Sequence, residues 1–342
     1  MKQTNFARIT TKYFSDFLTG QRNVSSNTIK SYRNTFRQLL TYMRDEKRIP
    51  PERLEFKDIN AETVVIFLLW LEKNNHISIS TRNQRLAAIH GFYRYAQAEY
   101  PDNMFEMQKI LNIPFKKKPL PTVSYLTKEE IKLILDQPDV WNRRGRRDLA
   151  LIAILYDTGA RVQELIDLCV KDIRLNSPAT VILTGKGRKT RCVPIMGNTE
   201  RLISKYMEEF NLKSNGRQQS PLFFNSRGEK FTRPGICYIL NKYFEKAKKS
   251  NPGIILSDSI HPHAFRHGKA VHMLESGINL IYIRDFLGHV SITTTEIYLK
   301  METELKRSAL ERSYPDVVTQ DIPEWKENTE LLQWLNDLCR GL

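Results

Sequence analysis

The sequence predicts a mainly α-helical protein with a small β-sheet, built as an all-helical N-terminal domain and a mixed α/β domain. Three observations support this fold class. Apolar residues recur at helical spacing through most of the 342-residue chain. Only two short segments, 180–185 and 190–195, have the character of strands. A proline- and lysine-rich stretch at 114–125 interrupts the helical pattern, and a chain of this length can bury two separate cores.

The N-terminal domain, residues 1–113, is expected to hold four helices. They cover residues 10–18, 25–46, 60–74 and 78–100. The second has a serine-rich start followed by apolar residues at intervals of three and four, which is the pattern of an amphipathic helix. The polar sides of the second and fourth helices carry basic residues, namely Lys30, Arg33, Arg37, Arg82 and Arg85.

Residues 114–125 are predicted to be an extended basic linker, with Lys116, Lys117 and Lys118 in a row. The second domain, residues 126–313, opens with a helix whose capping box pairs Thr127 with Glu130. Two strands are joined by the turn 186–189, too few for a doubly wound sheet. Including this first one, the helices of the domain are expected at 126–135, 147–159, 161–168, 233–249, 263–277, 279–289 and 292–310.

The charge of the chain indicates a polyanionic partner. The net charge is +15; residues 1–125 contribute +9, residues 126–313 contribute +10, and the tail 314–342 contributes −4. Basic charge spread over two domains suits a protein that holds nucleic acid from two sides, although ribosomal and membrane-surface proteins share this property. The start of the chain lacks the apolar core of a signal peptide, and no stretch is apolar enough to span a membrane. The four cysteines, which form no C-x-x-C pair, are expected to be reduced, so we expect a cytoplasmic protein without a membrane partner; they are Cys169, Cys192, Cys237 and Cys339.

Five of the seven histidines lie between residues 261 and 289, which suggests either a metal site or phosphate chemistry. His263 and His267 are four apart, as two metal ligands on one helix would be. However, Arg266 places a cation between them, and the chain has neither an HExxH glutamate nor paired cysteines. His263 and Arg266 instead combine a proton-transfer group with a guanidinium on one helical face, which suits a phosphate. No metal and no cofactor are expected.

Three other residues could serve the same chemistry. Arg161 follows a Thr-Gly turn, where Glu164 at i+3 could hold its guanidinium. Lys186 lies in a glycine-flanked turn between the strands, and Tyr298 follows His289 by nine residues. Taken singly, each has an ordinary explanation: a surface arginine at a helix start, a lysine at a hairpin tip, and a tyrosine buried on an amphipathic helix.

In this order, the motifs resemble the tyrosine recombinase, or lambda-integrase, family. They are "TGARVQEL", "GKGRKTRCVPI", "HAFRH" and "GHVSITTTEIY", the last being the most specific. The segments "NTIKSYRNTFRQLLTY" and "STRNQRLAAIHGFYRYA" are similar to the core-binding, SAM-like domain of that family, so the resemblance covers about residues 5–305. Two local departures are Phe265, where an aliphatic residue is more usual, and "HGKA", where a small residue and an aromatic usually follow the arginine.

The resemblance implies a site-specific recombinase that cleaves and rejoins DNA through a 3′-phosphotyrosyl intermediate, without metal or ATP. Tyr298 would be the nucleophile and His263 its base, while Lys186 would protonate the leaving 5′-oxygen. The phosphate would be held by Arg161, Arg266 and His289. The candidate DNA contacts are Lys30, Arg33, Arg37, Arg82, Arg85, Lys116, Lys117, Lys118, Arg188 and Lys189.

The partners implied are double-stranded recombination sites and further copies of the chain, forming a tetramer on two duplexes, with an accessory DNA-bending factor as an additional partner. The protein would associate with the nucleoid when bound to DNA. The acidic tail carries an apolar stripe that includes Leu331, Leu335 and Leu338, which would pack on its own catalytic domain or on a neighbouring subunit. Integration, excision, transposition and dimer resolution all remain open. The alternatives are a type IB topoisomerase-like enzyme, a catalytically inactive DNA-binding regulator and a basic RNA-binding protein.

Overall fold

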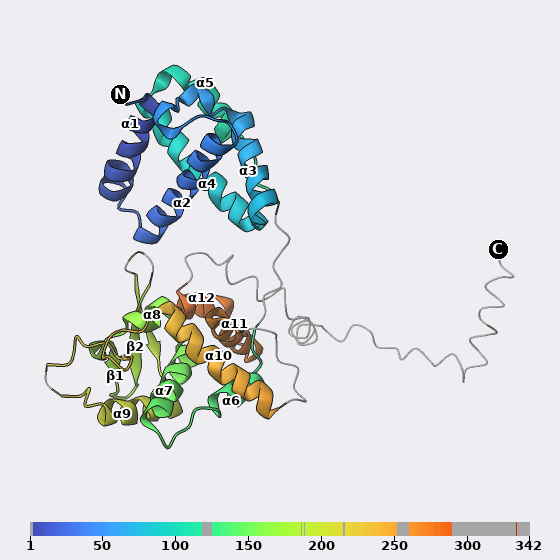
Figure 1. Cartoon of the computed structure of the whole chain (residues 1–342). Coiled ribbons are helices and arrows are strands. Elements are labelled where there is room, and N and C mark those ends of the chain that lie inside the picture. The colour runs from blue at the N-terminus through green and yellow to red at the C-terminus, as the bar shows by residue number, and fades with distance from the viewer. Residues whose placement is uncertain are drawn as a thin grey trace. The chain divides into compact units, whose positions relative to one another are not determined.

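The chain divides into two compact units, Met1–Thr122 and Val123–Leu342 (Figure 1). The structure is a computed structural model that describes residues 3–117, 125–185, 187, 189–214, 216–251, 260–288 and 333. The division between the units falls inside the stretch 114–125 that the sequence predicts to be a linker.

The first unit is all-helical, as predicted. Its elements are α1 (Asn5–Lys12), the π-helical η1 (Tyr13–Gln21), α2 (Ser26–Asp45), α3 (Ala61–Asn75), α4 (Ile79–Glu99) and α5 (Met104–Leu111), with short 3-10 turns between them. The side chains of Ser25, Asn60 and Ser78 cap α2, α3 and α4 by accepting a backbone N–H. The helix expected at 10–18 is part of the longer segment that begins at Asn5, and α5 was not predicted.

Aromatic packing holds the first unit together. Phe92 of α4 is fully buried, and its ring centroid lies 5.7 Å from Phe6, 5.4 Å from Tyr13 and 5.0 Å from Phe36, in edge-to-face arrangements. This geometry places the positive edge of one ring against the negative face of the next. The contacts connect α1, η1, α2 and α4, so Phe92 stands at the centre of this core.

The second unit combines helices with one three-stranded antiparallel sheet in the order β1–β2–β3. Its helices are α6 (Lys128–Leu135), α7 (Arg143–Thr158), α8 (Val162–Asp167), α9 (Gly197–Glu209), α10 (Arg233–Ser250), α11 (Pro262–Glu275) and α12 (Leu280–Leu287), and its strands are β1 (Ile173–Arg174), β2 (Thr180–Thr184) and β3 (Thr190–Pro194). The two predicted strands are confirmed, whereas β1 and α9 were not predicted. The helix expected at 292–310 and the tail 314–342, apart from Gln333, lie outside the described residues.

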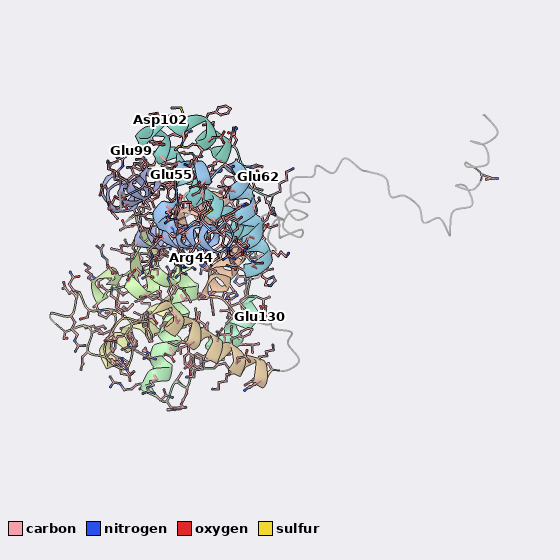
Figure 2. All side chains as sticks on the ribbon, turned by 45° about the horizontal axis from the view of Figure 1, so that its top comes forward. Arg44, Glu55, Glu62, Glu99, Asp102 and Glu130 are labelled. Atoms are coloured by element: carbon pink, nitrogen blue, oxygen red, sulfur yellow. The ribbon has the colours of Figure 1, made fainter. Side chains whose placement is uncertain are left out.

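Local sequence signals set several boundaries in the second unit. The predicted capping box is confirmed, because Thr127 and Glu130 each accept the other's backbone N–H at the start of α6; Glu130 is labelled in Figure 2. Helices α7 and α12 both end at a glycine in the left-handed conformation, Gly159 with φ +55° and Gly288 with φ +64°. A Cβ on Gly159 would lie 2.8 Å from Cδ2 of Leu287, so the glycine also allows the ends of α7 and α12 to meet.

Among the residues that the structure describes, no helix is both long and apolar enough to cross a membrane.

Replacing Phe92 by alanine should destabilise the first unit by ~3–5 kcal/mol, because it leaves a cavity among the surrounding rings. Phe105→Ala is the matched control, since that ring is 75% exposed and its loss should change the free energy of unfolding by no more than ~0.5 kcal/mol. Urea denaturation of the full chain, followed by circular dichroism, would measure both. Equal effects of the two substitutions would mean that Phe92 is not central to this core.

Candidate functional site

Arg161 lies directly before α8 and is held by Glu164, as its i+3 spacing suggested. Its Nη1 donates to Oε1 of Glu164 at 2.7 Å, and its backbone N–H donates to Oε2 at 2.8 Å. The carboxylate is almost fully buried, whereas a third of the arginine side chain is exposed. The buried end of this ion pair therefore fixes an arginine whose outer face remains open to solvent.

A second arginine, Arg191 of β3, shares the same carboxylate. Its Nη1 and Nη2 donate to the two oxygens of Glu164 at 3.0 and 2.8 Å. Burial by itself would raise the pKa of Glu164, but the hydrogen bonds from Arg191 and Arg161 outweigh it and lower the pKa to about 2. Glu164 is therefore ionised at neutral pH and joins the start of α8 to the sheet.

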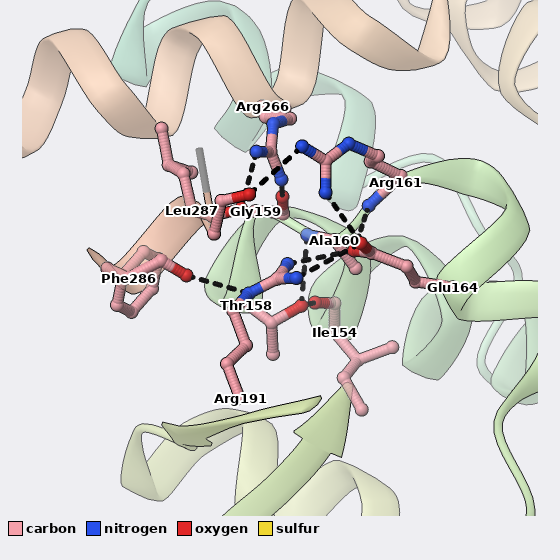
Figure 3. A network of polar contacts seen from close by, with 11 residues as sticks. Ile154, Thr158, Gly159, Ala160, Arg161, Glu164, Arg191, Arg266, Phe286 and Leu287 are labelled. Carbon is pink, nitrogen blue, oxygen red and sulfur yellow. Dashed lines mark hydrogen bonds and ion pairs between the residues drawn. The ribbon is translucent and has the colours of Figure 1, made fainter. Parts of the chain in front are cut away.

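Three arginines converge on the carboxyl end of α12 (Figure 3). Arg191 Nε donates to the carbonyl of Phe286 at 2.9 Å, Arg266 Nη2 to that of Leu287 at 2.5 Å, and Arg161 Nη2 to that of Gly288 at 3.2 Å. The last carbonyls of a helix lack intrahelical donors and carry a partial negative charge, so cations are favourable there. We call Arg161, Arg191 and Arg266 the arginine cluster.

Arg266 is the most deeply placed member of the arginine cluster. It is 3% exposed, and its Nη1 also donates to the carbonyl of Gly159 at 2.6 Å. Arg266 thus bridges the ends of α7 and α12, next to Arg161 (Figure 3). The two arginines that the sequence assigned to phosphate binding are brought together, from positions more than a hundred residues apart.

A glycine allows the hairpin to approach this cluster closely. A Cβ on Gly185, at the end of β2, would lie 2.8 Å from Oε1 of Glu164 and 3.6 Å from Nη1 of Arg161. Since Gly185 directly precedes Lys186 in the chain, the first glycine of "GKG" has a steric reason. Lys186 itself lies outside the described residues, as do Arg188, His289 and Tyr298.

His263 lies one turn before Arg266 on α11 and is exposed. The protein that covers part of its ring, and then the charges of Arg266 and Arg161, lower the pKa of His263 below its ordinary value. His267, whose ring centroid is 6.3 Å from that of His263, is half-buried, and burial and then His263 lower its pKa to about 4. Both imidazoles are therefore neutral near pH 7, and His263 is the more exposed of the two. No group of three possible metal ligands occurs in the described parts of the chain.

The basic candidates of the first unit fall into two groups. Lys30, Arg33 and Arg37 are exposed along α2, and Arg37 donates to the side chain of Asn34 at 3.0 Å. Lys30 and Arg33 lie in the first half of α2 and Arg37 lies just past its middle; α2 begins at the end of the unit opposite α5 (Figure 1). Of the acidic residues labelled in Figure 2, Glu55 forms an ion pair with Lys57 and Glu99 with Lys12. Lys30, Arg33 and Arg37 thus form an exposed basic row along one face of α2.

The second group of basic candidates makes contacts within the unit. Arg82 is 6% exposed and donates to the carbonyl of Pro114 at 3.2 Å, while Asn83 pairs with both backbone polar groups of Lys116. Lys116 Nζ forms an ion pair with Glu72 at 2.7 Å. Residues 114–116 are thus held against α3 and α4, and are not a free linker.

The other basic candidates differ in their surroundings. Arg85 is half-buried and donates to the carbonyl of Ser31 and the hydroxyl of Thr35. Lys117 and, on the hairpin, Lys189 are exposed, whereas Lys118 lies outside the described residues.

Arg191 is the member of the site that the sequence reasoning missed. A signal was present, since Arg191 has the same strand parity as the buried Val193 and Ile195, and an arginine on an apolar face needs an acidic partner.

Comparison with known proteins gives a consistent result over the whole chain. Residues 124–304 match the phage integrase family, and residues 11–100 match the N-terminal SAM-like domain of phage integrases. A putative integrase/recombinase, y4rC, of Sinorhizobium fredii is 35% identical over 337 residues, which cover 98% of this chain and 99% of that protein. Tyrosine recombinase XerC of Oceanobacillus iheyensis is 32% identical over 306 residues, covering 88% and 94% of the two chains.

Solved structures agree in fold. The XerH site-specific recombinase bound to its difH substrate has a TM-score of 0.65 at 24% identity and covers 84% of this chain and 80% of that one. The Tn1549 transposon integrase in complex with transposon right end DNA has a TM-score of 0.64 at 18% identity, covering 88% and 98%. The predicted fold class, a helical SAM-like domain joined to a mainly helical domain with a small sheet, is confirmed.

Glu164→Gln should destabilise the second unit by about 3 kcal/mol at pH 7, the order expected for a carboxylate whose pKa falls from 4.5 to about 2 on folding. A lowered pKa stabilises the folded state above the pKa of the unfolded chain, and this contribution is lost as the pH falls. The difference between the variant and the wild type should therefore shrink between about pH 4.5 and pH 2.

Urea denaturation at a series of pH values would measure this difference. Glu208→Gln is the control, because Glu208 is an exposed partner of Lys213 and its loss should have little effect. A destabilisation by Glu164→Gln that stays constant down to pH 2 would show that the ionised carboxylate does not support the cluster.

Proposed function

The chain belongs to the phage integrase family of tyrosine recombinases and is a site-specific DNA recombinase, and we propose that the arginine cluster is the phosphate-binding part of its active site. The observation that supports this most is that Arg161 and Arg266 lie against the same helix end, one partly exposed and one buried. The charges of Arg191 and Glu164 offset each other, so Arg161 and Arg266 leave an excess of positive charge at the site.

A phosphodiester that is attacked by a nucleophile gains negative charge on its nonbridging oxygens. Groups already oriented toward that charge lower the barrier most, because they need no rearrangement during the reaction. We assign direct contact with the phosphate to Arg161, whose outer face is open. Arg266 contributes its charge from directly behind it, and His289, which follows Gly288 in the chain, would donate a further hydrogen bond.

Proton transfer is assigned to His263, Tyr298 and Lys186. A tyrosine hydroxyl has an ordinary pKa of about 10 and attacks poorly unless a base removes its proton. His263 suits this role because its pKa is lowered, so that the imidazole is neutral at physiological pH. Lys186 would protonate the leaving 5′-oxygen. Attack by Tyr298 then gives a 3′-phosphotyrosyl link and a free 5′-hydroxyl, and a second 5′-hydroxyl reverses the step on a new strand.

DNA contact by the first unit is assigned to the basic row on α2. Lys30, Arg33 and Arg37 are exposed there along one helix, and phosphate contacts of this kind give affinity with little sequence information. Because Arg82 is buried, we assign it to holding residues 114–116 and not to contacting DNA. We further propose a tetramer on two duplexes, with an accessory DNA-bending factor where the site requires one.

Two other activities would use similar residues. A type IB topoisomerase relaxes a single duplex, whereas a recombinase exchanges strands between two; the XerC and integrase relatives favour exchange. A regulator that had lost its chemistry would have no need to keep the candidate residues for phosphate binding and proton transfer, all of which are present in the sequence.

Tyr298→Phe should bind DNA with near-normal affinity and form no covalent adduct, because only the attacking hydroxyl is removed. A nicked suicide substrate, incubated in excess EDTA and resolved on denaturing gels, would show the adduct for the wild-type chain alone. An adduct formed by the variant would redirect the assignment to Tyr282, which is 70% exposed. A wild-type reaction that stops in EDTA and resumes with Mg²⁺ would contradict the metal-free mechanism.

Lys186→Ala should slow cleavage by ~10²–10⁴-fold, the usual contribution of a general acid. A substrate whose bridging 5′-oxygen is replaced by sulfur should restore the rate, since a thiolate leaves without a proton. Lys189→Ala is the control, because Lys189 is an exposed lysine of the same hairpin. If Lys189→Ala is slowed and rescued by sulfur while Lys186→Ala is not, the acid is Lys189.

A further inference from the structure

We propose that Arg191 is a positioning residue for strand cleavage, which holds Arg161 and the end of α12 in the arrangement that the phosphate meets. The inference rests on the proposed role of Arg161. It concerns a residue that touches neither DNA nor the reacting atoms, and that acts only through Glu164 and the Phe286 carbonyl.

Arg191 occupies an unusual place for an arginine. In the register of the sheet it lies opposite Leu183, and Val181 opposite Val193; these three apolar residues are buried. Cross-strand partners share a face of the sheet, so Arg191 points toward the core of the second unit. Its side chain is only 12% exposed. A guanidinium in such a place is costly unless its donors are satisfied, and three of them bind Glu164 and Phe286.

These hydrogen bonds determine how Glu164 meets Arg161. Arg191 takes both carboxylate oxygens in a forked arrangement, so Arg161 binds Oε1 through Nη1 and leaves Nη2 for the carbonyl of Gly288. Without Arg191, Arg161 would be the one partner left to the carboxylate, which could turn about its bond from the Arg161 backbone N–H and present both oxygens to the Arg161 guanidinium. Arg161 would then move toward Glu164, and its charge would be neutralised by the one acidic group of the network.

The hydrogen bond from Arg191 to the Phe286 carbonyl also holds the end of α12 in position. Arg191 and Arg161 grip the carbonyls of Phe286 and Gly288, on either side of the Leu287 carbonyl that Arg266 holds. A Cβ on Gly288 would lie 3.0 Å from Nη1 of Arg191, so the contact is close. The chain continues from Gly288 into His289. Arg191 therefore connects β3, α8 and α12, the three elements that lead to Lys186, Arg161 and His289.

The test compares single-turnover cleavage of a suicide substrate by Arg191→Ala, Arg191→Lys and the wild type, at saturating DNA. Misplacement of a reacting group by about 1 Å costs ~10²-fold in rate, so Arg191→Ala should lower the cleavage rate constant by that order. Its DNA affinity should not change, because Arg191 faces the protein. Arg191→Lys keeps the charge but cannot bind both Glu164 oxygens and Phe286 at once, and should be intermediate.

Two controls separate positioning from a loss of folded enzyme. Misfolding lowers the fraction of chains that react, whereas misplacement lowers the rate constant of those that do, and single-turnover traces report both. Guanidinium ion at low millimolar concentration should accelerate Arg191→Ala by filling the space left by the side chain, and sodium chloride at equal ionic strength should not. Arg174→Ala, an exposed arginine of the same sheet, should cleave at the wild-type rate.

Each outcome has a definite meaning. Rate constants of Arg191→Ala and Arg191→Lys equal to that of the wild type would overturn the inference. So would weaker DNA binding with a normal rate at saturation, which would make Arg191 a DNA contact. If Arg191→Ala does not fold, the rate constant of Arg191→Lys decides alone. A wild-type chain that forms no adduct would contradict the proposed function itself and leave no cleavage step for Arg191 to support.

Discussion

The proposed active site depends on the ion pairs that Glu164 forms with Arg161 and Arg191. Three guanidinium groups around one helix end repel one another, and a buried carboxylate between two of them offsets that repulsion. The carbonyl oxygens at the end of α12 supply the remaining acceptors. Because each carbonyl takes a different arginine, the helix end and the cluster fix each other, and neither arrangement would persist without the other.

Sequence patterns predicted those features of the molecule that are set locally. Helix periodicity, the Thr127–Glu130 capping box and the i+3 pairing of Arg161 with Glu164 all involve residues within one turn of each other. The failures concern what packs on an element from elsewhere. Arg82 lies on the polar side of α4, yet it is buried because residues 114–116 return to cover it. The strand β1, with two residues, is too short to show a period, whereas α9, with 13 residues, is long enough to be recognised and was missed.

The departure "HGKA" from the family pattern has a structural explanation. Lys269 stands where an aromatic residue is usual, and its Nζ lies 3.3 Å from the buried Asp157 of α7. The ammonium also lies 5.1 Å from the ring of Tyr156 and 5.9 Å from that of Phe286. Aromatic contact is thus retained by a cation over two rings, while the acidic residue on α7 balances the charge. Phe286, one of these two rings, also supplies the carbonyl that accepts a hydrogen bond from Arg191.

The arrangement explains how one chain can keep the proposed anion-binding site assembled without its ligand. Three arginines against one carboxylate leave two positive charges in excess, an unfavourable state that the folding of the second unit must outweigh. The burial of Leu183, Val193 and their neighbours in the folded chain offsets this unfavourable charge before any DNA is bound. No reorganisation of these charges is then needed as the phosphate becomes more negative. Electrostatic preorganisation of this kind usually gives the largest part of rate enhancement. It follows that residues which only hold the arginines in place, Glu164 and Arg191, should matter to the rate almost as much as the arginines that meet the phosphate.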